Sequence, residues 1–435
     1  MTESSKPWPG SVPVALPLPE RAAVPDTGQH KGPRRQLLTV VSITALTAAG
    51  VLLSLVNGVA TARILAPSDR GLLSITLTTT GILGMISSLG TNVSVRVLLP
   101  RRQTSVRRYT HVSIRLIPLA IGTTFAFFLG YALLFQPDFL DPLLLLCVAW
   151  LGLSMYASSQ ITDLFNARGS VVLSAFLQML GFGFASFGVA FCALTGASLT
   201  GVVIAYAAGF TLRVLCGVFI ARKYISDNST GDAVSLVSSG IRLMGLNLGQ
   251  VVTYRSDQLL LGAFRDSATV GAFAIAATPA GLPQLFSNAV GQLIFHKTAS
   301  GALTRLALAG WAVLVFITTA LFSLLLYVSA PWLIPFVFGP GYDDAVPLLR
   351  ILVVAETALA PYLVLSRAAA GLRQTAVASS SGILGAVLML CSLLVLIPLY
   401  GSVGAAWASV LTYTIMSIYV TVMVLHPRRR GHLLP

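Results

Sequence analysis

The sequence predicts an all-α membrane protein with about 12 transmembrane helices, arranged as two six-helix bundles that are related as parallel repeats around a central cleft. Hydrophobic residues make up 55% of the 435 residues and charged residues only 10%, and the mean hydropathy is +0.84. A water-soluble fold of this composition would lack the polar surface to cover itself. Apolar segments of about 20 residues recur, which is the length that a helix needs to cross a bilayer. Loops rich in Lys and Arg alternate with loops that have few of them.

The apolar segments give the expected spans in chain order. The first six lie near residues 37–63, 71–98, 113–135, 142–165, 171–194 and 198–220. The second six lie near residues 240–263, 268–293, 304–328, 346–366, 376–398 and 402–425. Each is a run long enough for one helical crossing. The chain therefore divides into two sets of six spans.

The distribution of basic residues predicts the side of the membrane on which each loop lies. Basic residues gather before the first span and in every second connection after it, chiefly Lys31, Arg34, Arg35, Arg101, Arg102, Arg107, Arg108, Arg222, Lys223, Arg428, Arg429 and Arg430. The opposite connections carry Asp69, Asp138, Asp141, Asp266, Asp343 and Asp344 beside few arginines. Because cytoplasmic loops hold the excess of Lys and Arg, we expect a multi-pass protein of the cell (cytoplasmic) membrane with both termini in the cytoplasm.

The same reading divides the chain into five parts. Residues 1–36 are rich in Pro, Ala and Ser without apolar periodicity and are expected to be a disordered cytoplasmic tail. An N-terminal bundle over 37–221 and a C-terminal bundle over 240–426 are joined by a cytoplasmic linker over 222–239. A basic tail follows at 427–435. The first apolar run starts too late and is too long for a cleavable signal peptide.

Residue chemistry disfavours several classes of function. The net charge of +14 would suit nucleic acid, but the basic residues follow the topology and lack interleaved aromatic residues; anionic membrane lipids are the expected partners of this charge. Cys147, Cys192, Cys216 and Cys391 lie far apart inside apolar spans, so we expect neither a metal site nor disulfides. No group of His, Cys or carboxylate residues has the spacing of a catalytic site, and we expect no enzyme activity and no cofactor.

A weak internal repeat relates the two sets of spans. The segment 61–72 has a counterpart in 259–272, and in each a short polar turn leads to a glycine, Gly71 or Gly271, that opens the next helix. Because six is an even number, both halves enter the membrane in the same direction. Two such bundles that face each other across a cleft are typical of a rocking transporter.

Polar residues inside the spans indicate where a cleft would lie, since a polar face in contact with lipid is costly. One stripe on the seventh span consists of Asn247, Gln250, Tyr254, Asp257 and Gln258, with Arg255 at its border. A second stripe on the fourth span consists of Tyr156, Ser159, Gln160, Asp163 and Asn166. The spacing places each stripe on one helix face. Together they favour a water-filled cavity; the alternative is hydrogen bonding between helices without transport.

Glu356 is the other unusual residue within a span. It lies on the order of 15 Å from the outer end of the tenth span, at 1.5 Å per residue. A carboxyl group at this depth could take up a proton or a cation as the cleft opens and closes. The alternative is a structural pairing with Arg255 or Arg213.

Several motifs occur in a fixed order over residues 37–425. They are Arg63-Ile-Leu-Ala-Pro-Ser-Asp-Arg-Gly71, Arg255-Ser-Asp-Gln-Leu-Leu-Leu-Gly262, Val270-Gly-Ala-Phe-Ala-Ile-Ala276, Phe338-Gly-Pro-Gly-Tyr342 and Ile397-Pro-Leu-Tyr-Gly-Ser-Val-Gly-Ala-Ala406. By their order and placement the chain resembles the polysaccharide transport, or lipid-linked oligosaccharide flippase, family of the multidrug, oligosaccharidyl-lipid and polysaccharide exporter superfamily. The chain departs from the family pattern at Ala66, where such proteins often have Gly. It also departs from that pattern after Val270 and Gly271, where the usual Tyr is replaced by an aromatic residue at a shifted position, Phe273.

The resemblance implies a transporter that flips a polyprenyl-diphosphate-linked oligosaccharide from the inner to the outer leaflet by alternating access, for cell-surface polysaccharide biosynthesis. Arginines at the cleft would hold the diphosphate, with Arg255 the first candidate, followed by Arg63, Arg96 and Arg213. The alternative for Arg96 and Arg213 is that their side chains only reach to the inner membrane interface. Asn247, Gln250, Tyr254, Asp257 and Gln258 would contact sugar hydroxyls or shape the cavity. Without an ATP-binding loop, the energy would come from product consumption outside, the membrane potential or an ion gradient, and Glu356 or Asp257 would be the ion-responsive group. A polysaccharide polymerase or glycosyltransferases are further partners of such a protein.

Three other classes of function stay open. A cation-coupled multidrug exporter of the same superfamily would share the helix plan but prefer an acidic, aromatic cavity, whereas basic residues lie near the expected cleft. A non-transporting membrane scaffold of a polysaccharide assembly complex would not need the polar stripes. A membrane enzyme needs sizeable loops that carry reactive groups, and the longest outer connection, near 329–345, offers only Asp343 and Asp344.

Overall fold

The structure is a computed structural model that describes residues 33–135, 141–196, 198–224, 233–299, 303–372 and 374–425. The chain forms two compact units, Met1–Ser42 and Ile43–Pro435. Only residues 33–42 of the first unit are described, and they form the first turns of helix α1. The second unit holds all the other described helices. Within the described ranges every regular element is helical.

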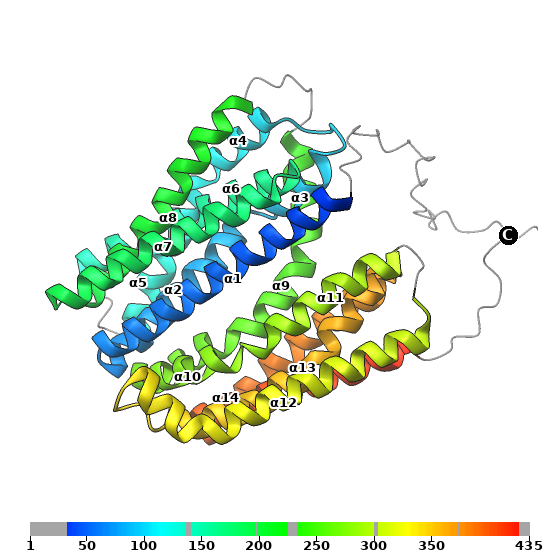
Figure 1. Ribbon diagram of the computed structural model, residues 1–435. Helices are drawn as coiled ribbons and strands as arrows, with labels where there is room; N and C mark the ends of the chain where they lie inside the picture. The colour runs from blue at the N-terminus through cyan, green and yellow to red at the C-terminus, as the bar shows by residue number, and fades with distance from the viewer. Residues whose placement is uncertain are drawn as a thin grey trace, which may run out of the picture. The chain divides into compact units, whose positions relative to one another are not determined.

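Figure 1 labels the helices in chain order. Those of the first half are α1 (Pro33–Ile64), α2 (Pro67–Ser87), α3 (Thr91–Leu98), α4 (Val106–Arg115), α5 (Ile117–Leu134), α6 (Pro142–Ala167), α7 (Val171–Thr195), α8 (Leu199–Ala221) and the short 3-10 helix η2 (Arg222–Tyr224). Those of the second half are α9 (Ala233–Phe264), α10 (Ser267–Ala280), α11 (Pro283–Ala299), α12 (Arg305–Phe338), α13 (Ala345–Gly371) and α14 (Thr375–Leu425). The predicted all-α membrane class is confirmed.

Two of the predicted spans are broken into bent pairs of helices. The span predicted at 71–98 consists of α2 and α3, which are bent by 54°. Gly90 lies between them with a φ of 70°, a left-handed conformation that glycine adopts without steric strain. The span predicted at 268–293 consists of α10 and α11, bent by 49°. Pro283 begins α11, a position where its missing N–H group breaks no helical hydrogen bond.

Helix α14 consists of two segments that meet at Gly401. This glycine has a φ of 61° and a ψ of −136°, which is not helical, and the spans predicted at 376–398 and 402–425 lie on either side of it. Among the described residues, eight helices are long and apolar enough to cross a membrane, or ten if each bent pair is one span. α9 is 32 residues long but carries Arg255 and Asp257 in its apolar stretch. The predicted number of twelve crossings stays a prediction.

The connection between the halves is shorter than expected. α9 begins at Ala233, so the last part of the linker predicted at 222–239 is helical. At the N-terminus, α1 begins at Pro33. Residues 1–32 and 426–435 lie outside the described residues, so the disordered tail and the basic tail stay predictions.

Helix α12 is longer than the apolar pattern indicated. It ends at Phe338, so the outer connection predicted near 329–345 is reduced to the residues after that point. Pro331 and Pro335 lie inside the helix. In an apolar environment the helical backbone is retained around proline because unpaired backbone groups are costly in lipid.

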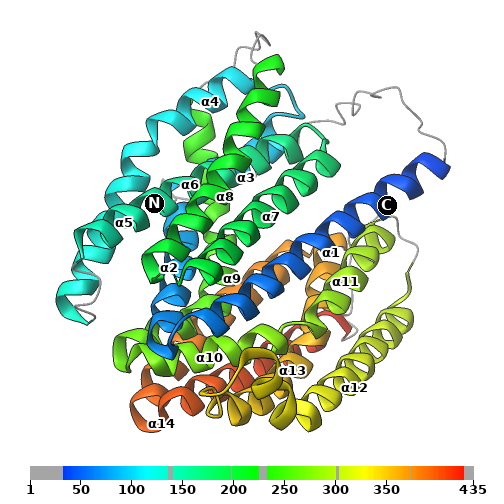
Figure 2. The same ribbon diagram turned by 60° about the vertical axis from the view of Figure 1, so that its left-hand side comes forward.

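Each half contains one helix that is packed on several sides. In the first half α6 contacts α8, α2 and α5, and in the second half α13 contacts α14, α12 and α11 (Figures 1 and 2). In their apolar windows, 56% of α6 and 61% of α13 is buried, against 28% for α7 and α12. Polar side chains on α6 and α13 are therefore shielded from lipid by neighbouring helices.

Glycines allow the backbones of α2 and α10 to touch where the two halves meet. A Cβ atom on Gly71 would lie 1.7 Å from the carbonyl oxygen of Ser267, and a Cβ atom on Gly271 would lie 2.3 Å from the carbonyl oxygen of Pro67. The contact is reciprocal, because each glycine faces the residue four positions before the other glycine. The repeat predicted around Gly71 and Gly271 thus corresponds to a contact between the halves (Figures 1 and 2).

A second close contact joins α3 to the beginning of α9. A Cβ atom on Gly90 would lie 2.1 Å from the carbonyl oxygen of Gly240, and one on Gly240 would lie 2.5 Å from the carbonyl oxygen of Leu89. Ser94 Oγ donates a hydrogen bond to the carbonyl oxygen of Leu236 at 2.9 Å. The first half is therefore joined to the second near the beginning of α2 and again at the bend between α2 and α3.

Candidate functional site

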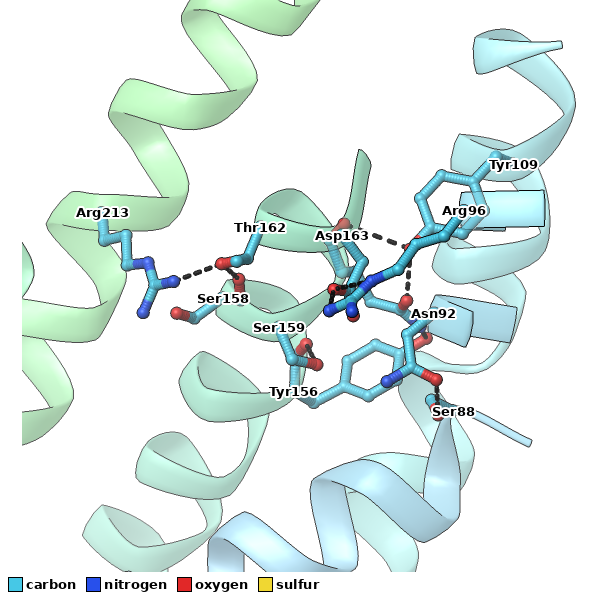
Figure 3. A network of polar contacts seen from close by, with 11 residues as sticks. Ser88, Asn92, Arg96, Tyr109, Tyr156, Ser158, Ser159, Thr162, Asp163 and Arg213 are labelled. Carbon is cyan, nitrogen blue, oxygen red and sulfur yellow. Dashed lines mark hydrogen bonds and ion pairs between the residues drawn. The ribbon is translucent and has the colours of Figure 1, made fainter. Parts of the chain in front are cut away.

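A network of polar side chains lies among α3, α6 and α8 in the first half (Figure 3). The residues on α6 come from its last turns, where Ser158, Ser159, Thr162 and Asp163 follow the spacing of one helix face. Arg96 reaches them from the last turn of α3, and Arg213 reaches them from α8. The breaking of the α2–α3 span at Gly90 lets α3 pack against α6.

An ion pair between Arg96 and Asp163 is the centre of this network. Arg96 Nε donates to Asp163 Oδ1 at 2.8 Å, and Nη2 donates to the same oxygen. The Arg96 side chain is 52% exposed, whereas the Asp163 side chain is 5% exposed. Asn92 also hydrogen-bonds to Asp163, and its Oδ1 accepts a hydrogen bond from Ser88 at 3.0 Å. The buried carboxylate is thus held from the α3 side.

Arg213 is held differently. It is only 6% exposed, and its Nη2 donates to the hydroxyl group of Thr162. Its buried Nε atom has no hydrogen-bond partner within the described part of the chain. The side chain lies against Gly181 on α7, where a Cβ atom would be 3.2 Å from Arg213 Cβ. The glycine at that position makes room for the aliphatic part of the Arg213 side chain, whose Cδ would lie 3.4 Å from the same Cβ atom.

An open cavity of about 270 Å³ lies between these two arginines. Its lining consists of Arg96, Met155, Ser158, Ser159, Thr162, Asp163, Gln178, Phe210 and Arg213. Of the stripe predicted on α6, Ser159 and Asp163 face this cavity. Asn166 is half-buried near the end of α6 and is not among the lining residues.

The remaining stripe residues on α6, Tyr156 and Gln160, join α6 to the amphipathic helix α4. Tyr109 on α4 donates its hydroxyl proton to Gln160 Oε1 at 2.5 Å. Gln160 Nε2 donates to the Tyr156 hydroxyl at 3.0 Å, and the Tyr156 hydroxyl donates to the carbonyl oxygen of Ser113 at 2.8 Å. All three side chains are buried. Their geometry is that of the alternative considered above, hydrogen bonding between helices.

The stripe predicted on α9 is divided in the same way. Gln258 Oε1 accepts hydrogen bonds from Ser74 at 2.9 Å and Thr78 at 2.8 Å, so it joins α9 to α2. The ring of Tyr254 packs edge-on against Tyr413, with the ring centroids 6.0 Å apart. The side chains of Asn247 and Gln250 lie outside the described residues.

The charged residues of α9 differ in exposure. Asp257 is 8% exposed, and its Oδ1 accepts a hydrogen bond from the backbone N–H of Gln258 at 2.7 Å. Arg255 is exposed. The two charges interact electrostatically, but the structure shows no side-chain hydrogen bond between them.

Glu356 on α13 is partly buried and accepts a hydrogen bond from Gln284 Nε2 on α11 at 2.5 Å. The hydrogen-bond partner of Glu356 is thus a neutral amide. The structural alternative considered from the sequence was a pairing of Glu356 with Arg255 or Arg213. Arg213 lies in the first-half cavity. The charge of Asp257 acts on Glu356, so the two carboxyl groups of the second half belong to one region.

Arg63 lies at the end of α1 and binds the end of another helix. Its Nε donates to the carbonyl oxygen of Val337 at 2.8 Å, and its Nη2 donates to that of Phe336 at 2.5 Å. These are carbonyls of the last turn of α12, which have no partner within the helix. Arg63 is therefore placed as a helix cap, away from the cavity of the first half.

The sequence did not single out Thr162, Gln178 or Tyr109, although each takes part in the cavity or its support. Thr162 directly precedes Asp163 in the sequence, so its place beside the predicted stripe could have indicated that it lies near the cavity. Gln178 lies alone in an apolar span, and Tyr109 lies outside the predicted spans. Among the described residues, no three His, Cys, Asp or Glu side chains come together in a possible metal site.

The fold is that of a multi-pass membrane protein built from apolar helices. It is similar to a structure of the lipid II flippase MurJ in an inward closed conformation, with a TM-score of 0.73, 14% identity, and 88% of this chain and 87% of that chain covered. It is also similar to a multidrug resistance MATE family transporter of the MOP superfamily in an inward-facing conformation, with a TM-score of 0.67, 12% identity, and 88% and 96% covered. A Vibrio cholerae MATE transporter gives a TM-score of 0.57 at 14% identity, with 89% and 94% covered.

Residues 38–295 match the family described as "Polysaccharide biosynthesis protein". The match covers more than half of the chain, and the chain belongs to this family. The resemblance drawn from the motifs is thereby confirmed. The comparison with curated proteins finds no match. The structural likenesses, all well below 25% identity, concern the fold.

Proposed function

We propose that this protein is a transporter that moves a polyprenyl-diphosphate-linked oligosaccharide from the inner to the outer leaflet, for the biosynthesis of a cell-surface polysaccharide. The observation that carries the proposal is an open cavity with two arginines among the membrane helices of a polysaccharide biosynthesis family member. A diphosphate and a row of sugar hydroxyls do not cross hydrocarbon unaided. A protein that shelters the head group lets the lipid tail stay in the bilayer.

The contacts between the halves support alternating access. The halves touch through glycine backbones at Gly71 and Gly271 and again at Gly90 and Gly240. At these glycines backbone meets backbone, and side-chain hydrogen bonds also join the halves, from Ser94 to Leu236 and from Ser74 and Thr78 to Gln258. In the proposed cycle the halves separate at one of these places while they stay joined at the other. Helix packing that has two discrete arrangements is the usual basis of such transitions.

The exposed and buried polar residues of α9 are proposed to contact the sugar part of the substrate. Arg255 is exposed and Asp257 and Tyr254 lie on neighbouring positions of the same helix. Asn247 and Gln250 continue this stripe in the sequence. If Arg255 binds the substrate, Arg255→Ala abolishes flipping while the amount of protein in the membrane is unchanged; retained flipping would remove Arg255 from the site.

The two carboxyl groups of the second half are proposed to couple transport to an ion. Glu356 is bonded to a neutral amide, Gln284, and Asp257 to a backbone N–H group. Among the described residues neither carboxyl group is bonded to a cationic side chain, so each retains capacity for a proton or a cation. If an ion binds at either residue during the cycle, the ion gradient would determine the direction of transport.

The experiment that tests the proposal is mass spectrometry of polyprenyl-linked sugars in cells depleted of this protein, with the accessibility of each leaflet probed in intact cells. We expect a completed repeat unit to accumulate in the inner leaflet alone. Unchanged lipid intermediates would contradict the proposal. Sensitivity to toxic organic cations would then favour the multidrug exporter, and its absence would favour the scaffold of a polysaccharide assembly complex.

A further inference from the structure

Basic side chains cover one face of helix α4 and the loop before it. Between residues 101 and 115 the chain carries five arginines, one histidine and no Asp or Glu. The arginine side chains are all exposed, and we call them the basic α4 face: Arg101, Arg102, Arg107, Arg108 and Arg115. Arg107, His111 and Arg115 recur every four residues, so they follow one side of the helix.

The opposite side of α4 fixes the direction in which this face points. Val106, Tyr109 and Val112 are buried, and they pack in one cluster with apolar residues of α6 and α8 (Figures 1 and 2). Ser105 caps the helix by accepting a hydrogen bond from the backbone N–H of Arg108 at 3.1 Å. One side of α4 is thus held by the protein and the other is charged, which is typical of a helix that lies at a membrane interface.

The basic α4 face ends where an apolar span begins. Only Leu116 separates α4 from α5, and the two helices pass together as one candidate membrane span. Leu119 is 39% exposed and lies about 6 Å beyond Arg115 along the helix axis. Ile114, which is 56% exposed, lies among the arginines themselves. Arginines beside exposed apolar side chains at the end of a span are expected at the depth of the lipid head groups.

Other cations of the predicted cytoplasmic side lie against aromatic rings of the protein. The guanidinium group of Arg168 is 3.8 Å from the ring centroid of Tyr224, and the ammonium group of Lys297 is 5.8 Å from that of Trp311. These contacts are cation–π interactions within the protein. Within the described ranges Arg107 and Arg115 make no such ring contact, so their guanidinium groups are available to a partner from outside.

We propose that the basic α4 face is a binding surface for the head groups of anionic phospholipids in the inner leaflet, and that lipid bound there holds α4 against α6. Guanidinium groups bind phosphate oxygens in pairs. Clusters of about four to eight basic residues beside a span are typical of anionic-lipid binding. The net charge of the chain predicts only a diffuse attraction to such lipids, whereas the structure gives this attraction a place on one fixed helix. A water-soluble acidic partner would meet the arginines but not the apolar side chains beside them.

Hydrogen bonds connect this surface with the polar residues of α6. The hydroxyl group of Tyr109 donates to Gln160 Oε1 at 2.5 Å, and the carbonyl oxygen of Ser113 accepts a hydrogen bond from the Tyr156 hydroxyl at 2.8 Å. Asp163 lies about one helical turn beyond Gln160 (Figure 3). Both ends of α4 are thus bonded to the part of α6 that forms a wall of the cavity. A bound phospholipid would therefore stabilise this wall without touching the transported substrate.

Native mass spectrometry of the full chain in a neutral detergent tests the proposal with two probes that have the same acyl chains, dioleoyl-phosphatidylglycerol and dioleoyl-phosphatidylcholine. We expect phosphatidylglycerol to bind the wild-type protein more tightly. Arg107→Gln combined with Arg115→Gln should weaken its binding about twentyfold, because each basic residue at the membrane surface contributes about fivefold. Binding of phosphatidylcholine, which has no net charge, should not change.

Arg305→Gln is the matched control. Like Arg107 in α4, Arg305 is exposed and lies in the first turn of its helix, α12, so its loss changes the net charge and the charge near a helix N-terminus in the same way. The control should leave the affinity for phosphatidylglycerol unchanged. Equal affinity of the wild-type protein for the two lipids, or an equal loss per charge in the control, would overturn the proposal; the first result would assign the face to an acidic protein segment.

Hydrogen exchange of the backbone amides of α4 tests the second part of the proposal. Phosphatidylglycerol should slow this exchange in the wild-type protein and in the Arg305→Gln control, because a bound head group holds the helix in place. It should not do so in the combined Arg107→Gln and Arg115→Gln variant. Unchanged exchange in the wild-type protein at saturating phosphatidylglycerol would overturn the stabilisation of α4. Neither measurement involves transport, so both results stand apart from the outcome of the leaflet assay in cells.

Discussion

The two halves of the molecule hold their buried polar side chains in opposite ways. In the first half, Arg96 and Arg213 face one carboxylate, Asp163, in an open cavity. In the second half, Asp257 and Glu356 are bonded to neutral donors, the N–H of Gln258 and the amide of Gln284. The first region is suited to an anion and the second to a proton or a cation. One internal repeat thus holds two sites of opposite electrostatic preference.

This difference suggests a division of work between the halves. A lipid-borne phosphate would bind among the helices of the first half, and the ion that drives the cycle would bind in the second. The contacts at Gly71 and Gly271 and the bonds from Ser74 and Thr78 to Gln258 connect the two regions. Changes confined to one region should therefore separate binding from coupling.

The largest separation is expected for Glu356→Gln. The neutral side chain keeps the shape and the bond to Gln284 but cannot change its charge. We expect translocation driven by an ion gradient to fall about fiftyfold, in the range typical of coupling between two sites, while phosphate binding in the first half is unchanged. Flipping in proteoliposomes with and without an imposed gradient measures this. Transport that stays the same across gradients of pH and potential would remove Glu356 from the coupling site.

An intermediate effect on folding is expected for Tyr109→Phe. The change leaves the buried Oε1 of Gln160 without the donor that lies 2.5 Å away. An unsatisfied buried acceptor costs about 1–3 kcal/mol, so the free energy of unfolding and the melting temperature should fall. Denaturant unfolding of the purified protein gives the value. Tyr254→Phe is the matched change on α9, where the tyrosine is held by ring packing against Tyr413, and it should cost less.

The smallest effect is expected for Arg63→Gln. It removes the two bonds to the last carbonyls of α12, and an exposed cap of this kind contributes about 1 kcal/mol. The melting temperature should fall slightly, and the affinity of the first-half cavity for geranyl diphosphate should not change. A tenfold loss of that affinity would show that Arg63 takes part in substrate binding as well as in capping.

The sequence could predict the helices because a membrane span leaves a long apolar run and a charge pattern at its ends. It could not predict the division of the spans at Gly90, since a single glycine in an apolar run gives no sign of the bend. The sequence also predicted that the outer connection begins near residue 329. In the structure helix α12 continues to Phe338 through Pro331 and Pro335, because unpaired backbone groups are costly in lipid.

The candidate site was predictable only as helix faces. The spacing of Tyr156, Gln160 and Asp163 placed them on one side of α6, but not opposite any particular neighbour. The structure separates them, because α4 covers the first two and α3 and α8 frame the third. Arg213 was named as a candidate because the family resemblance implies arginines that hold a diphosphate, whereas its unpaired Nε depends on packing that sequence spacing does not contain.

The reciprocal contact at Gly71 and Gly271 places a constraint on how the two halves can diverge in evolution. Each glycine is required by the backbone of the other half, since any side chain would meet a carbonyl oxygen at 1.7 Å or 2.3 Å. A backbone atom cannot be trimmed by a compensating substitution, so neither position can vary alone. A chimera that joins one half to the other half of a relative should assemble only when that relative also carries glycine at the matching position.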